Sequence, residues 1–348
     1  MTELLAGLHI EHVATPRLDT AILVDERADG EAVVFIHGNV SSSLFWQESI
    51  LALPAGFRGI APDLRGFGAS QTAPIDATRG VRDFSDDIHS LLTALNLERA
   101  HLVGWSMGGG VVMQFLLDHP KMVASLTLVS PVSPFGFGGS KTAAGIPTTV
   151  DDAGTGGGGA NPDFVAALAN GDRSADSPTS PRNILNAMYF ANDFRSPLEE
   201  VFVDSMLTTK TGEDNYPGDA QTSENWPGFA PGTRGVLNTM TPAHFNVSGI
   251  VDLETKPPVL WVHGTKDAIV ADGSMFDLAM LGQIGAIPGW PGDEICPPQP
   301  MVTQTRAVLD AYAAAGGVYR EVSLDCGHSA MVEKPEEFGA ALSELLQG

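Results

Sequence analysis

Cysteine, basic residues and long apolar runs are all scarce in this chain of 348 residues, and each shortage excludes a class of protein. Two cysteines, Cys296 and Cys326, are too few for a disulfide scaffold or a four-cysteine metal site. No run of about 18 apolar residues occurs, so we expect no membrane span. The N-terminal segment lacks a basic stretch followed by an apolar core, which predicts no signal peptide and a cytoplasmic protein.

The charge balance is strongly acidic. Asp and Glu number 42 against 19 Lys and Arg, a formal net charge of −23, which makes nucleic acid and anionic membrane surfaces poor partners. Hydrophobic residues make up 43% and charged residues 18%, as in globular proteins. No histidine or carboxylate cluster has metal-ligand spacing, so no metal ion is expected. We expect a small-molecule substrate, and the sequence is silent on oligomeric state.

Short apolar segments alternate with helical ones over most of the chain, which predicts an α/β fold with a doubly wound, mostly parallel sheet. The N-terminal segments 8–13 and 20–24 suggest an antiparallel hairpin. Further strands are expected at 32–36, 59–62, 100–105, 126–129, 259–262 and 319–324. Helices are expected at 81–97, 107–119, 301–315 and 335–346.

The alternation breaks between residues 131 and 255, where glycine-rich tracts and short helical candidates such as 180–192 appear. A structureless loop of that length is improbable in a compact domain, so we predict a mainly helical lid inserted into a core of 1–130 and 256–348. Its aromatic residues fit either the roof of an apolar pocket or the lid's own core. A second irregular stretch lies at 268–317.

One serine stands on a glycine-rich turn between a predicted strand and a predicted helix. Residues 104–108 read Gly-Trp-Ser-Met-Gly, which matches the G-x-S-x-G pattern in the strand–turn–helix context that its mechanism requires. Glycines allow the strained backbone that lifts the hydroxyl of Ser106 out of the turn. We therefore predict that Ser106 is a nucleophile.

A serine nucleophile needs a histidine base that is held by a carboxylate. His328 follows the last predicted strand, and Asp267 follows the strand at 259–262, so both stand where parallel strands end. Asp325 is the alternative acid, although we expect it to be structural. His37 and His263 each precede a glycine at a strand end and are expected to orient loops.

Acyl transfer also needs donors for the developing oxyanion. The backbone N–H of Met107, at the start of its helix, is one candidate, and Asn39 in the loop after 32–36 is the other, with Val40 as its alternative. Trp46 and Trp105 lie beside these residues in the sequence. They either line the substrate pocket or simply pack in the core.

These motifs resemble the α/β-hydrolase superfamily. The resemblance rests on HGN at 37–39, DLRGFGAS at 63–70, GWSMGG at 104–109, HGTKD at 263–267 and CGH at 326–328, in family order. It implies an α/β-hydrolase fold with Ser106 as nucleophile, Asp267 as acid and His328 as base. The loop HGNVSSSLFW is similar to that of haloalkane dehalogenases, but those enzymes use an aspartate nucleophile. Ser106 therefore favours ester chemistry.

The sequence thus predicts a serine hydrolase that cleaves a carboxylic ester or lactone of a small, fairly apolar substrate without a cofactor. The same residues could cleave an amide or a carbon–carbon bond next to a carbonyl, or could perform haloperoxidase-like perhydrolysis. A non-enzymatic ligand receptor is a third class, disfavoured because the triad is complete. Cys296 and Cys326 are expected to be independent thiols, the alternative being a bridge that restrains the histidine loop.

Overall fold

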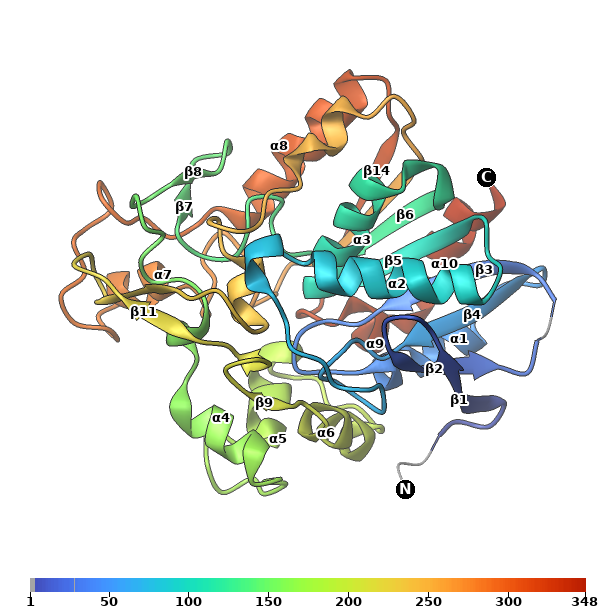
Figure 1. The fold of residues 1–348 in the computed structure, drawn as a ribbon, viewed down its shortest axis with the longest axis horizontal. Helices are drawn as coiled ribbons and strands as arrows, with labels where there is room; N and C mark the ends of the chain where they lie inside the picture. The colour runs from blue at the N-terminus through green and yellow to red at the C-terminus, as the bar shows by residue number, and fades with distance from the viewer. Residues whose placement is uncertain (1–3, 28) are drawn as a thin grey trace.

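An eight-stranded sheet forms the centre of the computed structural model, which describes residues 4–27 and 29–348 (Figure 1). Its strand order is β1-β2-β4-β3-β5-β6-β13-β14. The first two strands pair antiparallel with each other and β2 pairs antiparallel with β4, whereas all pairs from β4 to β14 are parallel. The strands are β1 (Leu8–Ala14), β2 (Asp19–Asp25), β3 (Glu31–Ile36), β4 (Phe57–Pro62), β5 (Ala100–Trp105), β6 (Val123–Val129), β13 (Val259–Gly264) and β14 (Tyr319–Leu324).

Helices cover both faces of this sheet. One face carries α2 and α3, which are drawn in front of the strands in Figure 1, together with α8, and the other carries α1, α9 and α10. Their bounds are α1 (Gln47–Leu51), α2 (Arg82–Ala94), α3 (Met107–Asp118), α8 (Met301–Ala314), α9 (Ala330–Glu333) and α10 (Pro335–Gln347). Short 3-10 turns stand at η1 (Ser43–Trp46), η2 (Ala77–Arg79) and η3 (Pro120–Met122). The predicted doubly wound fold is confirmed.

The local patterns explain these elements. All six residues of β5 are buried, as expected for a central parallel strand that is covered on both faces. In α2 the apolar residues spaced by three and four, Phe84, Ile88 and Leu91, are buried on one side. The predicted strands at 100–105 and 319–324 coincide with β5 and β14, and the other predicted core elements differ from the structure only at their ends.

The segment 131–255 is less helical than predicted. Its longest helix has nine residues, and most of its length is turns and irregular backbone. Its elements are β7 (Ser140–Lys141), β8 (Ile146–Pro147), η4 (Gly157–Gly159), α4 (Pro162–Ala169), α5 (Pro181–Ile184), the π-helix η5 (Leu185–Tyr189), α6 (Glu199–Leu207), β9 (Thr211–Gly212), β10 (Tyr216–Pro217), β11 (Ala220–Thr222), β12 (Phe229–Pro231), η6 (Leu237–Met240) and η7 (Ser248–Asp252). Glycine and proline, which interrupt helices, account for the difference. The second irregular stretch contains α7 (Leu278–Gln283).

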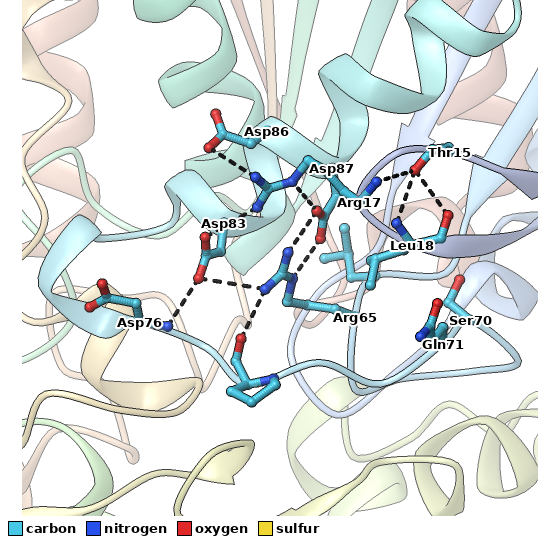
Figure 2. A network of polar contacts seen from close by, with 12 residues as sticks. Thr15, Arg17, Leu18, Arg65, Ser70, Gln71, Asp76, Asp83, Asp86 and Asp87 are labelled. Atoms are coloured by element: carbon cyan, nitrogen blue, oxygen red, sulfur yellow. Dashed lines mark hydrogen bonds and ion pairs between the residues drawn. The ribbon is translucent and has the colours of Figure 1, made fainter.

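A buried ionic cluster fastens the loop after β4 to the start of α2 (Figure 2). The guanidinium of Arg65 donates two hydrogen bonds to Asp87, at 2.6 and 2.7 Å, and lies 3.5 Å from Asp83. Arg17, from the turn between β1 and β2, donates to the same Asp87 at 2.6 Å. The cluster therefore joins the antiparallel edge, the DLRGFGAS loop and α2 into one unit.

Candidate active site

Ser106 occupies a strained turn between β5 and α3. Its backbone has φ 57° and ψ −121°, a region that non-glycine residues rarely adopt. The N–H of Ser106 donates to Val129 O at 2.9 Å, and its carbonyl accepts from Gly109 N–H at 2.9 Å, so both strand and helix hold the turn. A side chain at Gly108 would collide with the carbonyl of Ile36, so only glycine lets α3 begin this close to β3.

The carboxylate and the histidine predicted from the sequence meet in the structure. Nδ1 of His328 lies 2.8 Å from Oδ2 of Asp267, and both side chains are only 2% exposed. The other oxygen of Asp267 accepts the N–H groups of Ile269 and Val270 at 2.8 and 2.9 Å. The carboxylate is thereby oriented, and Nε2 of His328 is left for a second proton-transfer partner.

The close approach of two loops brings this pair together. Because β13 and β14 are parallel neighbours, the loops that carry Asp267 and His328 leave the same edge of the sheet. The N–H of Lys266 donates to Cys326 O at 2.9 Å. A side chain at Gly264 would collide with the carbonyl of Gly327, so glycine is required where the loops touch.

The histidine loop is also tied to the serine turn. Nε1 of Trp105 donates to His328 O at 2.9 Å, and the two rings lie 5.4 Å apart. Within the described residues His328 forms no hydrogen bond to the hydroxyl of Ser106. Catalytic hydrogen bonds of this kind often form only once substrate is bound.

The loop after β3 lies directly against the serine. A Cβ built on Gly38 would stand 2.9 Å from Cβ of Ser106. The carbonyl of Gly38 accepts from Ser41 Oγ at 2.8 Å and from Nδ1 of His37 at 2.7 Å. Burial lowers the pKa of His37, and its Nε2 accepts the N–H of Leu64 at 2.9 Å, so this histidine orients the loop, as expected.

Two backbone amides near the serine remain available. A trans peptide points its N–H opposite to its carbonyl, so the anchored carbonyl of Gly38 directs the N–H of Asn39 away from His37 and Ser41. The N–H of Met107 stands in the first turn of α3, where no intrahelical acceptor exists. In the described part of the chain neither amide donates a hydrogen bond.

Tyr189, which the sequence did not single out, joins the insertion to this loop. Its buried hydroxyl donates to Asn39 O at 2.9 Å and also lies 3.3 Å from Val40 O. Its ring stands 6.2 Å from the ring of His328, and its carbonyl accepts the N–H of Ser329 at 3.1 Å. No motif surrounds Tyr189, so nothing in the sequence distinguishes it from the other aromatic residues of the insertion.

Glu333 is a second residue that the sequence did not reveal. Its two carboxylate oxygens accept the N–H of Gly327 at 2.9 Å and the N–H of Ala191 at 2.8 Å. Burial raises the pKa of Glu333, while these hydrogen bonds oppose that shift. The carboxylate therefore bridges the histidine loop and the insertion. The feature of the sequence that could have identified Glu333 is its position just after the CGH motif, in the segment that forms α9.

The two tryptophans do not line the cavity near the site, which corrects the prediction that they bind substrate. Trp46 is 0% exposed and packs between Phe35 and Phe338, with ring centroids 5.1 and 6.2 Å away. Trp105 is also 0% exposed and packs 5.0 Å from Phe45. Both rings are enclosed by the core, so packing, the alternative considered above, describes them.

The remaining candidates have structural surroundings. Asp325 is 72% exposed in its side chain and pairs with Lys266 at 3.0 Å. His263 contacts Glu321 at 2.7 Å and stacks on Trp261. Both cysteines are free and buried, and burial raises the pKa of the Cys326 thiol to about 12. Among residues 4–27 and 29–348 no group of side chains could hold a metal ion.

A cavity of about 290 Å³ adjoins the loop after β3, residues 37–40, which carries the predicted oxyanion donor Asn39 and is called the oxyanion loop below. Asn39, Val40 and Tyr189 line the end next to the serine turn, and the insertion and α7 supply the remaining walls. Trp46 and Trp105 are absent from the described lining. The cavity thus begins at the residue that follows Gly38, which contacts Ser106.

The architecture described above is that of the α/β-hydrolase fold. The family model for the alpha/beta hydrolase fold matches residues 31–281, and the chain belongs to that family. The chain resembles carboxylesterase YbfK of Bacillus subtilis, with 32% identity over 124 residues, 36% of this chain and 42% of that protein. It also resembles non-heme chloroperoxidase CPO-A1 of Kitasatospora aureofaciens, with 36% identity over 143 residues, 40% of this chain and 51% of that protein.

The sequence matches span only about half or less of these relatives, whereas the structural match is nearly complete. The crystal structure of carboxylesterase CesB (YbfK) from Bacillus subtilis superimposes with a TM-score of 0.59 and 19% identity, covering 97% of this chain and 91% of that one. This likeness shows the fold. No helix in the described residues has the length and apolar character needed to cross a membrane.

Proposed function

We propose that the protein cleaves carboxylic esters or lactones of small, apolar substrates through Ser106, His328 and Asp267. The observation that carries this proposal is the buried hydrogen bond between His328 and Asp267, at the sheet edge where the strained turn presents Ser106. The half-buried Ser106 stands between fully buried neighbours, so its side chain is the accessible one of the turn.

The chain's own residues supply each step. His328 accepts the proton of the Ser106 hydroxyl as its oxygen attacks the ester carbonyl, and Asp267 stabilises the imidazolium that forms. The N–H groups of Met107 and Asn39 receive the developing oxyanion, each donor contributing about 3–4 kcal/mol to the barrier reduction. His328 then protonates the leaving alcohol. Water, activated by the same histidine, releases the acid from the acyl-enzyme.

The similarity to a chloroperoxidase favours a second candidate function, perhydrolysis. Hydrogen peroxide would replace water in the second step and yield a peracid, which oxidises halide in solution. Peroxide-dependent halogenation in acetate buffer that disappears in Ser106→Ala supports this function. Amide and carbon–carbon bond hydrolysis need the same residues, and a substrate panel distinguishes them from ester cleavage.

The test is the Ser106→Ala variant together with a fluorophosphonate probe. We expect the wild type to be labelled at Ser106 and the variant to lose both labelling and ester turnover, by at least about 10⁴-fold, while its circular dichroism stays unchanged. Wild-type activity in Ser106→Ala would refute the assignment. A folded wild-type protein with no labelling and no turnover would instead favour the ligand receptor.

A further inference from the structure

The cavity beside the oxyanion loop is lined without any charge. Among the described lining residues there is no Asp, Glu, Lys, Arg or His. The polar side chains are neutral: two asparagines, two threonines and two tyrosines. Burial raises the pKa of both phenols, Tyr189 and Tyr216, so they stay protonated at physiological pH. A charged group that entered this space would lose its hydration and find no counter-ion.

The cavity has the oxyanion loop on one side and an exposed apolar rim on another. Asn39 and Tyr189 stand at the catalytic end. Met275 and Phe276 also line it and are 37% and 41% exposed, so they form its solvent side. The distal part of a substrate therefore passes uncharged and mostly apolar side chains. At about 30 Å³ for each water-sized group, the volume of about 290 Å³ holds about ten non-hydrogen atoms.

Two cavity walls, α7 and the segment 136–138, are joined by buried hydrogen bonds of Asp277 and Gln299, which we call the clamp. Asp277 caps α7 through Ala279 N–H at 3.0 Å and accepts the N–H of Gln299 at 2.7 Å. The side chain of Gln299 in turn accepts the N–H of Gly138 at 2.5 Å and donates to Gly136 O at 3.0 Å. Because Asp277 and Gln299 are 2% and 0% exposed, the clamp is shielded from water and limits how far the walls can separate.

We infer that the substrate is an uncharged ester whose apolar part, a chain or ring of about ten non-hydrogen atoms, occupies this cavity, and that a charge on that part excludes it. The inference rests on the proposed function. The net charge of −23 acts in the same direction on anions, but salt screens that long-range repulsion, whereas the local exclusion inside the cavity persists.

The first experiment compares ester length on both sides of the scissile bond. The p-nitrophenyl esters of acetate, hexanoate, octanoate, decanoate and palmitate vary the acyl side, and alkyl acetates vary the alcohol. We expect kcat/KM to peak at about six to ten carbons on one side, because longer chains exceed the clamped cavity. On that side a terminal carboxylate should lower kcat/KM by about 100-fold against its methyl ester, even at high salt.

The second experiment adds a cation to the rim. Phe276→Arg should raise the ratio of kcat/KM for the carboxylate substrate to kcat/KM for its methyl ester about tenfold. Ile284→Arg is the matched control, because Ile284 is 53% exposed just beyond α7 and is not part of the described lining. Ile284→Arg should leave kcat/KM unchanged for both substrates.

The outcomes separate this inference from the function on which it rests. The inference is overturned if kcat/KM does not depend on chain length on either side of the scissile bond. It is also overturned if the carboxylate substrate and its methyl ester have equal kcat/KM, or if the difference between them disappears at high salt. Discrimination that Phe276→Arg does not relieve overturns it as well. In each case, continued labelling of Ser106 and turnover of acetate esters leave the proposed function standing. Absence of both labelling and turnover overturns the two together.

Discussion

At the scale of single residues, the site depends on positions where the backbone or the environment is unfavourable in itself. Ser106 holds a positive φ, and Val40 in the oxyanion loop does so as well, with φ 46°. Such conformations cost about 1–3 kcal/mol each and persist only where surrounding contacts impose them. Here those contacts come from β6, α3 and Tyr189.

Replacing Asp267 tests whether the buried carboxylate orients the histidine. In Asp267→Asn the amide no longer stabilises an imidazolium and favours the wrong tautomer, so kcat should fall by about 10⁴-fold. Asp325→Asn is the matched control, since Asp325 is exposed and pairs with Lys266. Ester turnover measures both variants. Equal losses of turnover in the two variants would show that the loss in Asp267→Asn does not come from the contact between its side chain and His328.

Asp152 provides a pH-dependent test of stability. Burial raises its pKa from 3.8 to about 6, with a smaller contribution from Asp151, and its Oδ1 has no partner among the described residues. A raised carboxyl pKa means that the folded protein holds a proton which the unfolded chain releases. Stability conferred by this group is therefore present below pH 3.8 and is lost as the pH rises through about 6.

Asp152→Asn should remove this penalty without straining the turn, because asparagine tolerates the φ of 51°. We expect urea unfolding at pH 8 to show a gain of up to about 3 kcal/mol, which shrinks towards pH 4. A gain of equal size at both pH values would contradict the titration and point to packing instead.

At the scale of elements, parallel strands bring distant loops to one edge, and buried polar contacts hold them there. The segment from Tyr189 to Ala191 shows this, because it forms hydrogen bonds with Asn39, after β3, and with Ser329 and Glu333, at the two ends of α9. The insertion is thus attached directly to the loops that carry the proposed base and oxyanion donor.

The ionic cluster around Arg65, drawn in Figure 2, predicts that replacing Arg65 destabilises the protein more than replacing Arg79. Arg65→Leu removes two hydrogen bonds to the buried Asp87 and leaves that carboxylate with Arg17 alone, which should cost about 3–5 kcal/mol in the free energy of unfolding. Arg79→Ala is the control. Arg79 also pairs with Asp83, but its side chain is 40% exposed, so its loss should cost at most about 1 kcal/mol. Similar costs, measured by urea unfolding, would show that burial does not govern the cluster.

At the scale of the whole molecule, the acidic charge is the dominant property. A net charge of −23 repels itself across the surface, and salt screens this repulsion beyond about 10 Å at 0.1 M. We expect the Tm to rise by about 2 °C, or about 1 kcal/mol, between about 10 mM and about 150 mM NaCl. A fall in Tm would mean that exposed ion pairs outweigh the self-repulsion. Differential scanning calorimetry at constant pH measures the change.

The sequence by itself determined the alternation of strands and helices, the turn of Ser106, and the placement of Asp267 and His328 at strand ends. These features are local, because each depends on residue periodicity or on a motif of a few residues next to a strand. The break in this alternation over 131–255 is equally local, but the mostly irregular backbone found there could not be predicted, since its short helices depend on tertiary contacts.

Only the tertiary structure decided the rest of the site. Tyr189 and Glu333 bond to loops that are far away in the chain, and no local pattern records those contacts. The sequence left open whether Trp46 and Trp105 line the substrate pocket or pack in the core, and in the folded chain the core encloses both. The uncharged cavity likewise arises where the oxyanion loop, the insertion and α7 meet. Which side chains face a shared space depends on how elements pack, and that is a property of the folded chain alone.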